Sequence, residues 1–421
     1  MRTEKVRLAA LVLLLVAEGC SSGTPAAPDL AAGSSGDGGG ASSSGAGGVT
    51  ASGGNGGTIV GSTGTGGSEM GGLDASGGTG PADSGFGGGG TGDGGPSGPS
   101  PMLAILGQFT ASDVPAKGPG EADPIPRSWT APATPPDLPG EGIAQHPMLY
   151  AGEGYNTLFL VNQGKVIWTY SAGSGGEIDD VWMMTNAHVL FTVMSRVLEV
   201  TPKKEIVWRY TPPAGTEVHS CQPIGLDKVM MIQNGQPAKV LIINKSNNAV
   251  EVEHALPDAG ATTHPQFRRF RMTAAGTYLA PYLEVGKVVE YDKNFNVIWS
   301  YQIVSPWAAI RLHNGNTLIQ SEKLRSAREV NSKGETVWEF TQSELPAGIV
   351  QRNTQTSDRL STGNTVIFSS MRDPSVIQAV EVTPDKKVVW VLQDWKNLGP
   401  ATTAQFLDEP GIPEKPGDLQ H

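Results

Sequence analysis

The sequence predicts an all-β fold over residues 146–421, a six-bladed β-propeller of four-stranded antiparallel blades. Three observations predict it. One unit recurs along the chain, its copies lie about one blade length apart, and turn residues divide each copy into short alternating runs. A repeat of about 40 to 50 residues built from short strands is typical of propeller blades.

The recurring unit is clearest in SAREVNSKGETVWEF, residues 326–340. Apolar and polar residues alternate on both sides of a turn, and the second run carries Trp338. Alternation with a period of two is the pattern of a half-buried strand, so the unit is predicted to be a hairpin. Five further copies occur, four before it and one after it, and one of them has Glu251 in place of tryptophan. The six key positions, about 44 residues apart on average, are 168, 208, 251, 299, 338 and 390.

A second hairpin precedes each copy. Asn314-Gly315 separates two alternating runs, and both residues tolerate the positive φ of a two-residue turn. The same signal recurs within 357–370, SDRLSTGNTVIFSS. Each copy is therefore predicted to form four strands, and in the clearest copy these begin near positions 308, 316, 327 and 335.

The first copy lacks one strand. It begins at its second strand, near residues 146–150, whereas an alternating segment at about 402–408 follows the last copy. We predict that this C-terminal strand pairs into the first blade as its innermost strand. Such closure removes the exposed edges of the sheet.

The repeated tryptophan is interpreted as an anchor between blades. Five of the nine tryptophans occupy the key position in the outermost strand. A large apolar side chain at a fixed depth suits packing between neighbouring sheets. Stacking on a ligand is the alternative, but an outermost strand faces neighbouring blades rather than the axis.

Residues 1–20 are interpreted as a bacterial lipoprotein signal peptide. A basic start, MRTEKVR, precedes an apolar run too short to span a bilayer. The sequence AEGC at 17–20 resembles a lipobox, in which Cys20 would be lipidated and would attach the protein to a membrane. We therefore expect a cell-envelope lipoprotein, anchored in the outer membrane and facing the periplasm or the cell surface. An ordinary signal peptide cut nearby is the alternative.

The composition changes twice before the propeller. Residues 21–100 hold 31 glycines and no apolar periodicity, so a disordered Gly/Ser-rich tether is expected. Residues 101–145 are rich in proline and are expected to form an extended lead-in over the domain surface, anchored by Trp129. Of the total charge of −11, residues 101–421 carry −6. A mildly acidic domain argues against nucleic acid as a partner.

The pattern NGNTLI … EV … KGETVWEF resembles two related groups of propellers over about 146–408. One is the quinoprotein-like (PQQ-like) repeat family, and the other is the six-bladed arylsulfotransferase-like family. The second resemblance implies sulfate transfer between phenolic compounds through a channel histidine surrounded by cations. The candidates that it suggests are His219 and His264 as catalytic residues, with Arg268, Arg269 and Arg311 as anion-binding residues. The alternative is that these side chains satisfy loop backbone and neutralise nearby carboxylates.

No cofactor is predicted. Quinone-dependent dehydrogenases carry a vicinal cysteine pair, and here Cys221 is the only cysteine after residue 20. We interpret it as a small buried residue. No metal site is assigned, although Glu177, Asp179 and Asp180 are spaced like the oxygen ligands of calcium. Solvated carboxylates in a turn are the alternative.

Two functions from different classes are therefore considered. The first is a non-catalytic binding or scaffold module, monomeric, displayed at the cell envelope on its lipid anchor, with an envelope protein or glycan as partner. The second is an arylsulfotransferase-like enzyme. Geometry separates them, because convergence of His219, His264 and Arg311 on one anion would favour the enzyme.

Overall fold

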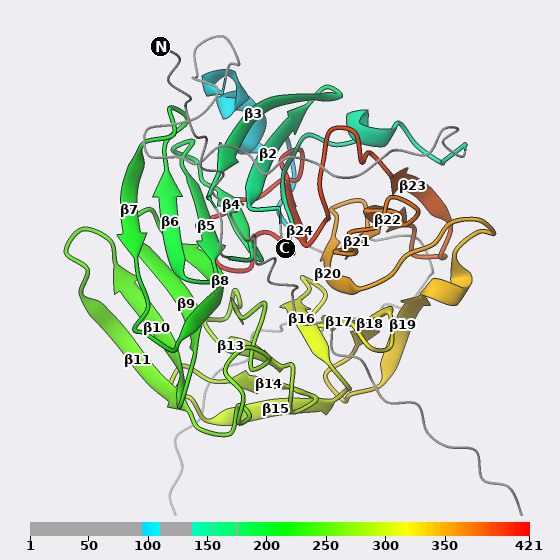
Figure 1. Cartoon of the computed structure of the whole chain (residues 1–421). Coiled ribbons are helices and arrows are strands. Elements are labelled where there is room, and N and C mark those ends of the chain that lie inside the picture. The colour runs from blue at the N-terminus through cyan, green and yellow to red at the C-terminus, as the bar shows by residue number, and fades with distance from the viewer. Residues whose placement is uncertain (1–94, 110–136, 154, 174–175) are drawn as a thin grey trace, which may run out of the picture. The chain divides into compact units, whose positions relative to one another are not determined.

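The chain folds as six four-stranded antiparallel sheets arranged around one axis, which confirms the predicted propeller (Figure 1). The computed structural model describes residues 95–109, 137–153, 155–173 and 176–421. The expected signal peptide with Cys20, most of the expected tether and Trp129 lie outside these residues. No helix among the described residues is long and apolar enough to cross a membrane.

Blades one to three follow the order of the chain, apart from the innermost strand of blade one. Blade one consists of β24 (Thr403–Phe406), β1 (Met148–Ala151), β2 (Thr157–Asn162) and β3 (Lys165–Ser171). Blade two consists of β4 (Val181–Met183), β5 (Val189–Val193), β6 (Arg196–Val200) and β7 (Ile206–Tyr210). Blade three consists of β8 (Glu217–Ile224), β9 (Lys228–Asn234), β10 (Ala238–Asn244) and β11 (Val250–Leu256).

Blades four to six continue in the same way. Blade four consists of β12 (Arg271–Met272), β13 (Tyr278–Tyr282), β14 (Lys287–Tyr291) and β15 (Val297–Gln302). Blade five consists of β16 (Pro306–Arg311), β17 (Thr317–Ser321), β18 (Ser326–Val330) and β19 (Thr336–Thr341). Blade six consists of β20 (Thr354–Arg359), β21 (Thr365–Ser369), β22 (Ala379–Val382) and β23 (Val388–Leu392). Three short 3-10 helices complete the described elements: η1 (Pro101–Gln108), η2 (Gly142–Ala144) and η3 (Gln342–Glu344).

The predicted ring closure is confirmed. β24 pairs antiparallel with β1, so that Met148 lies opposite Phe406 and Ala151 lies opposite Thr403. The innermost strand of the first blade therefore comes from the far end of the chain. Blade one loses its free inner edge, and the sheet joins both ends of the repeat.

Local sequence explains the shape of each blade. Gly315 and Gly334 adopt φ values of 86° and 81° in the two hairpin turns of blade five, a region that glycine enters without strain. A β-bulge follows Glu329, where this residue pairs with Trp338. The same bulge occurs between the third and fourth strands of blades two, four and six, at Glu199, Glu290 and Glu381. Bulges increase local twist, which suits a propeller blade.

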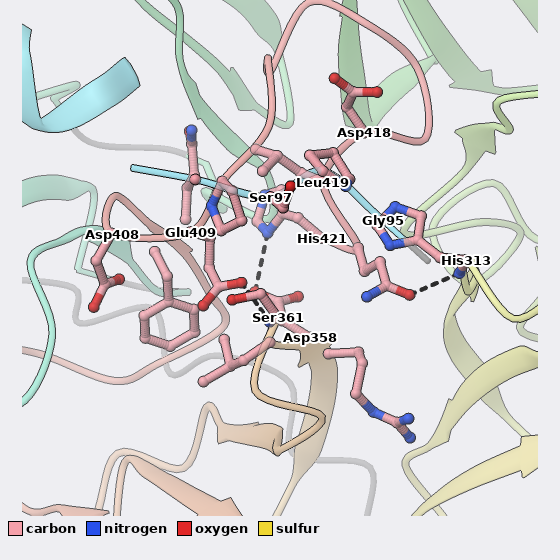
Figure 2. Close-up of a pocket in the computed structure, with 18 residues that line it drawn as sticks. Gly95, Ser97, His313, Asp358, Ser361, Asp408, Glu409, Asp418, Leu419 and His421 are labelled. Atoms are coloured by element: carbon pink, nitrogen blue, oxygen red, sulfur yellow. Dashed lines mark hydrogen bonds and ion pairs between the residues drawn. The ribbon is translucent and has the colours of Figure 1, made fainter. Parts of the chain in front are cut away.

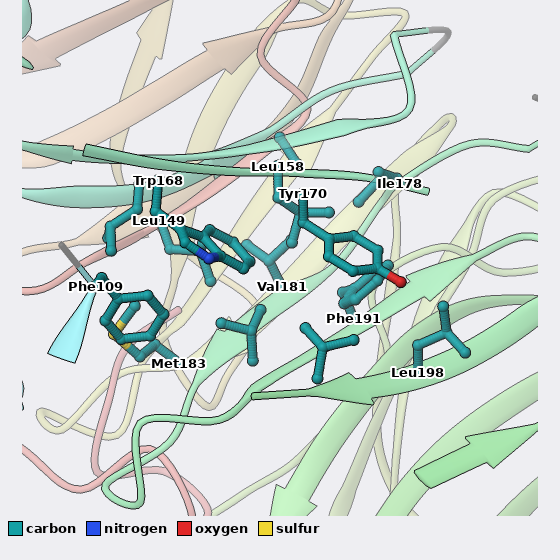
Figure 3. Packing of buried hydrophobic residues seen from close by; sticks show 14 of the residues in the cluster. Phe109, Leu149, Leu158, Trp168, Tyr170, Ile178, Val181, Met183, Phe191 and Leu198 are labelled. Atoms are coloured by element: carbon teal, nitrogen blue, oxygen red, sulfur yellow. The ribbon is translucent and has the colours of Figure 1, made fainter. Parts of the chain in front are cut away.

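The hydrophobic core lies between neighbouring blades. Figure 3 shows one such layer, in which Trp168 and Tyr170 of blade one face Val181 and Phe191 of blade two. Phe109, which follows η1, packs edge-on against Trp168 with ring centroids 5.5 Å apart. Phe109 of the lead-in thus contributes to the core.

The tryptophan anchors are confirmed and carry a hydrogen bond that the sequence did not reveal. The Trp168 indole donates to the Pro202 carbonyl of the next blade at 2.8 Å, and the Trp338 indole donates to the Pro384 carbonyl at 2.9 Å. The Trp208 indole reaches the Asn248 side chain of blade three at 2.8 Å. Each bond ties an outermost strand to the outer turn of the following blade.

In blades two, four, five and six a glutamate lies opposite the tryptophan and adds an ion pair between blades. These glutamates lie on the third strand and pair with a cation of the following blade. The pairs are Glu199–Lys245 at 2.6 Å, Glu290–Arg311 at 2.5 Å, Glu329–Arg359 at 2.6 Å and Glu381–His146 at 3.0 Å. The recurring EV dipeptide before the turn belongs to the strand pattern predicted from the sequence. Its glutamate therefore also forms contacts between blades.

One end of the axis is covered by residues 407–421, which we call the cap segment. Glu414 accepts from the Thr185 backbone N–H at 2.5 Å, in the inner hairpin turn of blade two. His313, in the corresponding turn of blade five, contacts the Gly417 carbonyl at 3.0 Å, and Ser361 of blade six donates to Glu409 at 2.6 Å. The first strands of the blades begin at the opposite end.

Candidate functional site

His219 and His264 meet at the end of the axis where the first strands begin. His219 lies on β8, and His264 lies in the loop before β12. Their ring centroids are 5.2 Å apart, and both rings contact the same oxygen, Oε2 of Glu217, at 2.9 Å. The prediction that both histidines lie near the starts of first strands is confirmed.

Carboxylates surround this pair. Oδ2 of Asp179 lies 2.5 Å from Nδ1 of His219, and Oε2 of Glu177 lies 3.9 Å from both His219 Nδ1 and His264 Nε2. Glu153 lies close to Glu177 and Asp179, with their oxygens within 4.8 Å of one another. We call this group the histidine–carboxylate cluster: Glu153, Glu177, Asp179, Glu217, His219 and His264.

The topology of the propeller explains why residues so distant in sequence converge. Glu177 and Asp179 precede β4, Glu217 opens β8, and His264 precedes β12, so successive blades each present the start of an inner strand. Glu153 follows β1, which runs antiparallel to β24 and therefore ends at the same side. The cluster draws on blades one to four.

Solvent exposure of the side chains increases across the cluster, from a buried base to a solvent-exposed rim. His219 is fully buried and the Asp179 side chain is 2% exposed, whereas the His264 side chain is 46% exposed. Glu177 and Glu217 lie between these extremes. Charge at the rim is therefore accessible to a ligand, and charge at the base is held in a low-dielectric environment.

Burial and mutual repulsion set the protonation of the carboxylates. Burial, followed by the charge of Asp179, raises the pKa of Glu177 and raises the pKa of Glu153 well above its usual range. Hydrogen bonds from His219 and His264 lower the pKa of Glu217. The Glu217 contact in turn raises the pKa of His264, against the opposing effect of burial. Glu153 and Glu177 therefore lack enough positive charge around them, whereas Glu217 has it.

Two buried carboxylate oxygens in the cluster have no hydrogen-bond partner among the described residues. They are Oε2 of Glu177 and Oδ1 of Asp179. Buried polar atoms are nearly always satisfied, because leaving one unpaired costs about 1–3 kcal/mol. Both atoms belong to side chains that face the two histidines.

The structure brings only one of the three candidate arginines to the cluster. Nη2 of Arg268 lies 2.9 Å from Nε2 of His264, and its guanidinium lies over the Trp307 ring at 4.8 Å. Arg311 instead forms the ion pair with Glu290 and stacks over Trp299 at 5.5 Å, at an outer seam between blades. Convergence of His219, His264 and Arg311 on one anion is therefore not observed.

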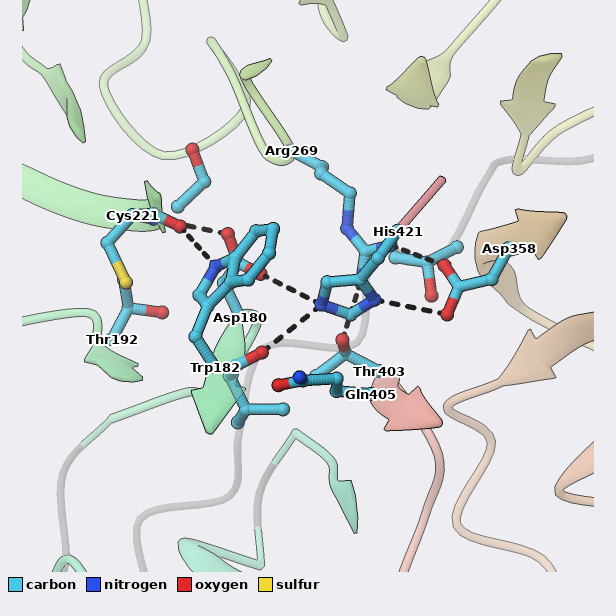
Figure 4. Close-up of polar contacts among 12 residues, drawn as sticks. Asp180, Trp182, Thr192, Cys221, Arg269, Asp358, Thr403, Gln405 and His421 are labelled. Atoms are coloured by element: carbon cyan, nitrogen blue, oxygen red, sulfur yellow. Dashed lines mark hydrogen bonds and ion pairs between the residues drawn. The ribbon is translucent and has the colours of Figure 1, made fainter. Parts of the chain in front are cut away.

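Arg269 belongs to a separate network on the axis (Figure 4). It is 1% exposed and donates to Asp358 at 3.0 Å and to the Thr403 hydroxyl. His421 of the cap segment contacts the same Asp358 at 3.1 Å, and its ring lies edge-on to Trp182. This network fills the axis with paired charges, so Arg269 is committed to structural contacts.

The three acidic residues considered for calcium are not gathered at one point. Asp180 accepts two hydrogen bonds from Arg271, at 2.7 and 2.8 Å, and one from the Cys221 backbone N–H at 3.1 Å. Asp180 thus belongs to the axis network, whereas Glu177 and Asp179 belong to the histidine–carboxylate cluster. Cys221 is buried, as predicted, and burial raises the pKa of its thiol well above the usual range.

A cavity of about 510 Å³ lies on the cap side of the propeller (Figure 2). Its lining includes Asp358, Ser361, Glu409 and His421. His421 and Asp358 already pair with each other at 3.1 Å, and Glu409 accepts from Ser361 at 2.6 Å. These polar groups are satisfied within the protein, although Oδ1 of Asp408, which also lines the cavity, has no hydrogen-bond partner among the described residues.

Comparison with known proteins supports the fold alone. No protein-family model matches the sequence, and no curated protein sequence matches it significantly. A protein of unknown function from Bacteroides caccae is similar in structure, with a TM-score of 0.56 and 22% identity, over 61% of this chain and 97% of that chain.

Two other structures align less well. A catalytically inactive virginiamycin B lyase from Staphylococcus aureus aligns with a TM-score of 0.46 and 11% identity, over 63% of this chain and 91% of that chain. BamB from Moraxella catarrhalis aligns with a TM-score of 0.37 and 12% identity, over 64% and 82%. The six four-stranded sheets define a six-bladed β-propeller, an architecture that fits a binding or scaffold module.

Sequence reasoning missed Glu153 and the role of Glu217 as the shared partner of both histidines. Glu153 follows the second strand of a blade whose first strand comes from residues 403–406, so its place beside Glu177 depends on ring closure. Polar residues next to the innermost strands of a propeller gather at its axis, and this could have pointed to Glu153 and Glu217. Applying it requires the strand boundaries of each blade, and the degenerate third copy of the repeat obscures them.

Proposed function

We propose that the protein is a binding module held at the cell envelope on a lipid-anchored tether, and that it takes a positively charged ligand at the histidine–carboxylate cluster. One observation carries the choice of ligand. Four carboxylates converge at this end of the axis around two histidines and a single arginine, Arg268. A concentration of negative charge at a partly exposed rim attracts cations and repels anions.

The same observation weighs against sulfate transfer at this site. A sulfuryl group in transfer carries negative charge that cations and hydrogen-bond donors must stabilise. Here Arg269 and Arg311 are engaged elsewhere with Asp358 and Glu290. His219 has a carboxylate at each ring nitrogen, Asp179 at 2.5 Å and Glu217 at 2.9 Å, which leaves neither nitrogen facing an anionic substrate.

The envelope location rests on the N-terminal sequence. The AEGC motif ending at Cys20 supports a lipid anchor, and the glycine-rich stretch over 21–100 supports a flexible tether that displays the propeller away from the membrane. The partner is then a cationic group on an envelope protein or glycan. A monomeric module with one such site suits capture at a surface.

Binding of a fluorescently labelled tetralysine peptide to the purified protein tests the ligand class. We expect saturable binding that weakens with salt, because screening reduces attraction at an exposed rim. Glu177→Gln and Glu217→Gln each remove one rim charge and are expected to weaken binding. Glu251→Gln and Glu253→Gln are matched controls on the outer strand β11, and they leave binding unchanged.

Two results would overturn the proposal. One is peptide affinity that is equal in the rim variants and the β11 controls. The other is turnover of an aryl sulfate with a phenol acceptor that disappears in His219→Ala and His264→Ala, since that would establish the enzyme instead. The anchor is tested separately by Cys20→Ala, which is expected to move the protein from the membrane fraction to the soluble fraction.

A further inference from the structure

We propose that the histidine–carboxylate cluster holds one divalent transition-metal ion, with Glu177, His219 and His264 as ligands and Asp179 beside them. This inference deepens the proposed function, on which it rests, because it names a cation that the acidic end of the propeller takes. It is carried by the direction of the two imidazoles, by the spacing of the ligand atoms and by the unpaired oxygens.

Glu217 fixes the direction of both imidazoles. Its Oε2 lies 2.9 Å from Nε2 of His219 and 2.9 Å from Nδ1 of His264. A carboxylate accepts hydrogen bonds, so these two nitrogens donate. The opposite nitrogens, His219 Nδ1 and His264 Nε2, both lie 3.9 Å from Oε2 of Glu177, and His219 Nδ1 also contacts Asp179 at 2.5 Å. Histidines that bind metals almost always donate their other N–H to a carboxylate or carbonyl, and here one carboxylate serves both rings.

The contact with Arg268 supports the same assignment. Nη2 of Arg268 lies 2.9 Å from Nε2 of His264. A guanidinium only donates, so this nitrogen is unprotonated and its lone pair accepts from Arg268, a bond that a metal ion would replace. The ring nitrogen that faces Glu177 is therefore in the form that binds a metal, and the hydrogen on Nδ1 is the one held by Glu217.

The ligand atoms are spaced for one ion. Oε2 of Glu177 lies 3.9 Å from His219 Nδ1 and 3.9 Å from His264 Nε2. Two ligands of a tetrahedral zinc ion lie roughly 3.4 Å apart, given bonds of about 2.1 Å. A shift of a few tenths of an ångström in the Glu177 side chain closes this difference. The ion also takes the place of the hydrogen between His219 Nδ1 and Asp179 Oδ2, since metal ligands must be deprotonated.

Unpaired oxygens point to a missing cation. Oε2 of Glu177 and Oδ1 of Asp179 are buried and have no hydrogen-bond partner among the described residues. Asp179 as a whole is 3% exposed, so solvent does not compensate for it. A cation among these atoms would supply the partner that both lack and would offset the excess of four carboxylates over Arg268.

The ligand types select the class of metal. Two imidazoles with a carboxylate form the set found in open zinc sites and in non-haem iron sites. Calcium and magnesium prefer an all-oxygen environment. We therefore expect zinc, or a similar divalent transition metal, to bind more tightly than calcium. The partly exposed His264 leaves the ion open to a further ligand from solution.

Isothermal titration of the chelator-treated protein with Zn²⁺ tests the proposal. We expect one ion per chain and a rise in Tm on binding. His264→Ala and Glu177→Gln each remove a proposed ligand and are expected to weaken Zn²⁺ binding by at least about tenfold. Glu217→Gln removes the hydrogen-bond acceptor of both imidazoles and is expected to weaken it by about tenfold, because loss of such a partner typically costs this much. The matched control is His254→Ala, because His254 lies on the outer strand β11 and stacks on Phe295 at 3.9 Å.

His264 lies in an exposed loop, so its removal is expected to leave the fold intact, which circular dichroism checks. Substitution with Co²⁺ gives a second readout, since bound imidazole produces visible absorption that His264→Ala alters. Absence of saturable Zn²⁺ binding, tighter binding of Ca²⁺ than Zn²⁺, or equal affinity in His264→Ala and His254→Ala would each overturn the inference. If Zn²⁺ fails while tetralysine binding still depends on Glu177, only the metal site is wrong; if both fail, the proposed function is wrong as well.

Discussion

Glu381 on β22 reaches across the seam between the last blade and the first to contact His146, with Oε2 and Nε2 3.0 Å apart. Asp408 holds the other ring nitrogen at 3.1 Å. The ring stands edge-on to Trp390, with centroids 5.3 Å apart. His146 therefore occupies at the closing seam the place that Lys245, Arg311 and Arg359 occupy between other blades.

Stability is expected to fall in mildly alkaline solution because of His146. Burial opposes its charged form, but the hydrogen bonds and charges of Asp408 and Glu381 outweigh burial and raise its pKa from 6.5 to about 9. A group whose folded pKa is raised stabilises fully below its unfolded pKa, and the contribution is lost as pH rises from about 6.5 through 9. The contribution of His146 to the free energy of unfolding is roughly 3 kcal/mol.

Urea unfolding of wild type and His146→Gln across this pH range measures the effect. The His146→Gln variant is expected to be less stable than wild type at pH 6. Its free energy of unfolding is expected to change less with pH between pH 6.5 and 9.5. Glu409 lies near the same ring and has its own pKa raised by burial. Parallel curves for the two proteins would show that another group controls the alkaline transition.

Removal of residues 400–421 is expected to unfold the propeller. The deletion takes away β24, which supplies four residues to blade one, together with the cap segment. Exposed edges and lost burial then exceed the whole free energy of unfolding, typically about 5–15 kcal/mol. Thermal melting by circular dichroism is the measurement, and a truncated protein with an unchanged Tm contradicts the closure shown by the structure.

Trp338→Phe isolates the hydrogen bond of one anchor. Phenylalanine keeps an apolar ring between blades five and six but removes the indole donor to Pro384. We expect a loss of about 0.5–1.5 kcal/mol in the free energy of unfolding. The control is Val337→Ala on the same strand, where the side chain is 52% exposed and the expected change is smaller. Equal effects of the two substitutions would argue that the indole bond contributes nothing.

Arg311→Met tests whether this arginine serves the seam or a ligand. It leaves Glu290 largely buried without its cation, and we expect a loss of about 1–3 kcal/mol in stability. The double variant Arg311→Met with Glu290→Gln is expected to recover part of this loss, because it removes the unpaired charge. Tetralysine and Zn²⁺ affinities are expected to stay unchanged, and a change in either would place Arg311 at the ligand site after all.

The fold could be predicted because the repeat is written in local patterns. Hairpin turns such as Asn314-Gly315 and the strand with Trp338 depend on neighbours within a few residues, and the structure reproduces them. Even the closing strand could be inferred, because the first copy of the repeat lacked its innermost strand and one further strand followed the last copy. These inferences require only the number and order of the strands, and they do not depend on where individual side chains lie.

The candidate site could be predicted only in part, since it depends on which side chains turn towards the axis. His219 and His264 were recognised from their positions before first strands, and they do meet. Arg269 and Arg311 have the same charge and similar positions, yet acidic partners from other blades, Asp358 and Glu290, take them away. These ion pairs join residues up to about 90 positions apart in the sequence, so no local sequence pattern predicts them.

Blade one remains unfinished until the chain has been made as far as residue 406. Before then the inner edge of β1 has no partner, and the inner turns of blades two, five and six lack the cap segment. A nascent chain therefore carries an open sheet edge through most of its synthesis, and such edges pair readily with other chains. Folding of the ring is consequently a late and long-range event, slow for its size. The ring cannot close until its last repeat is complete, and this delay would suit the export proposed above, because the chain stays unlocked until then.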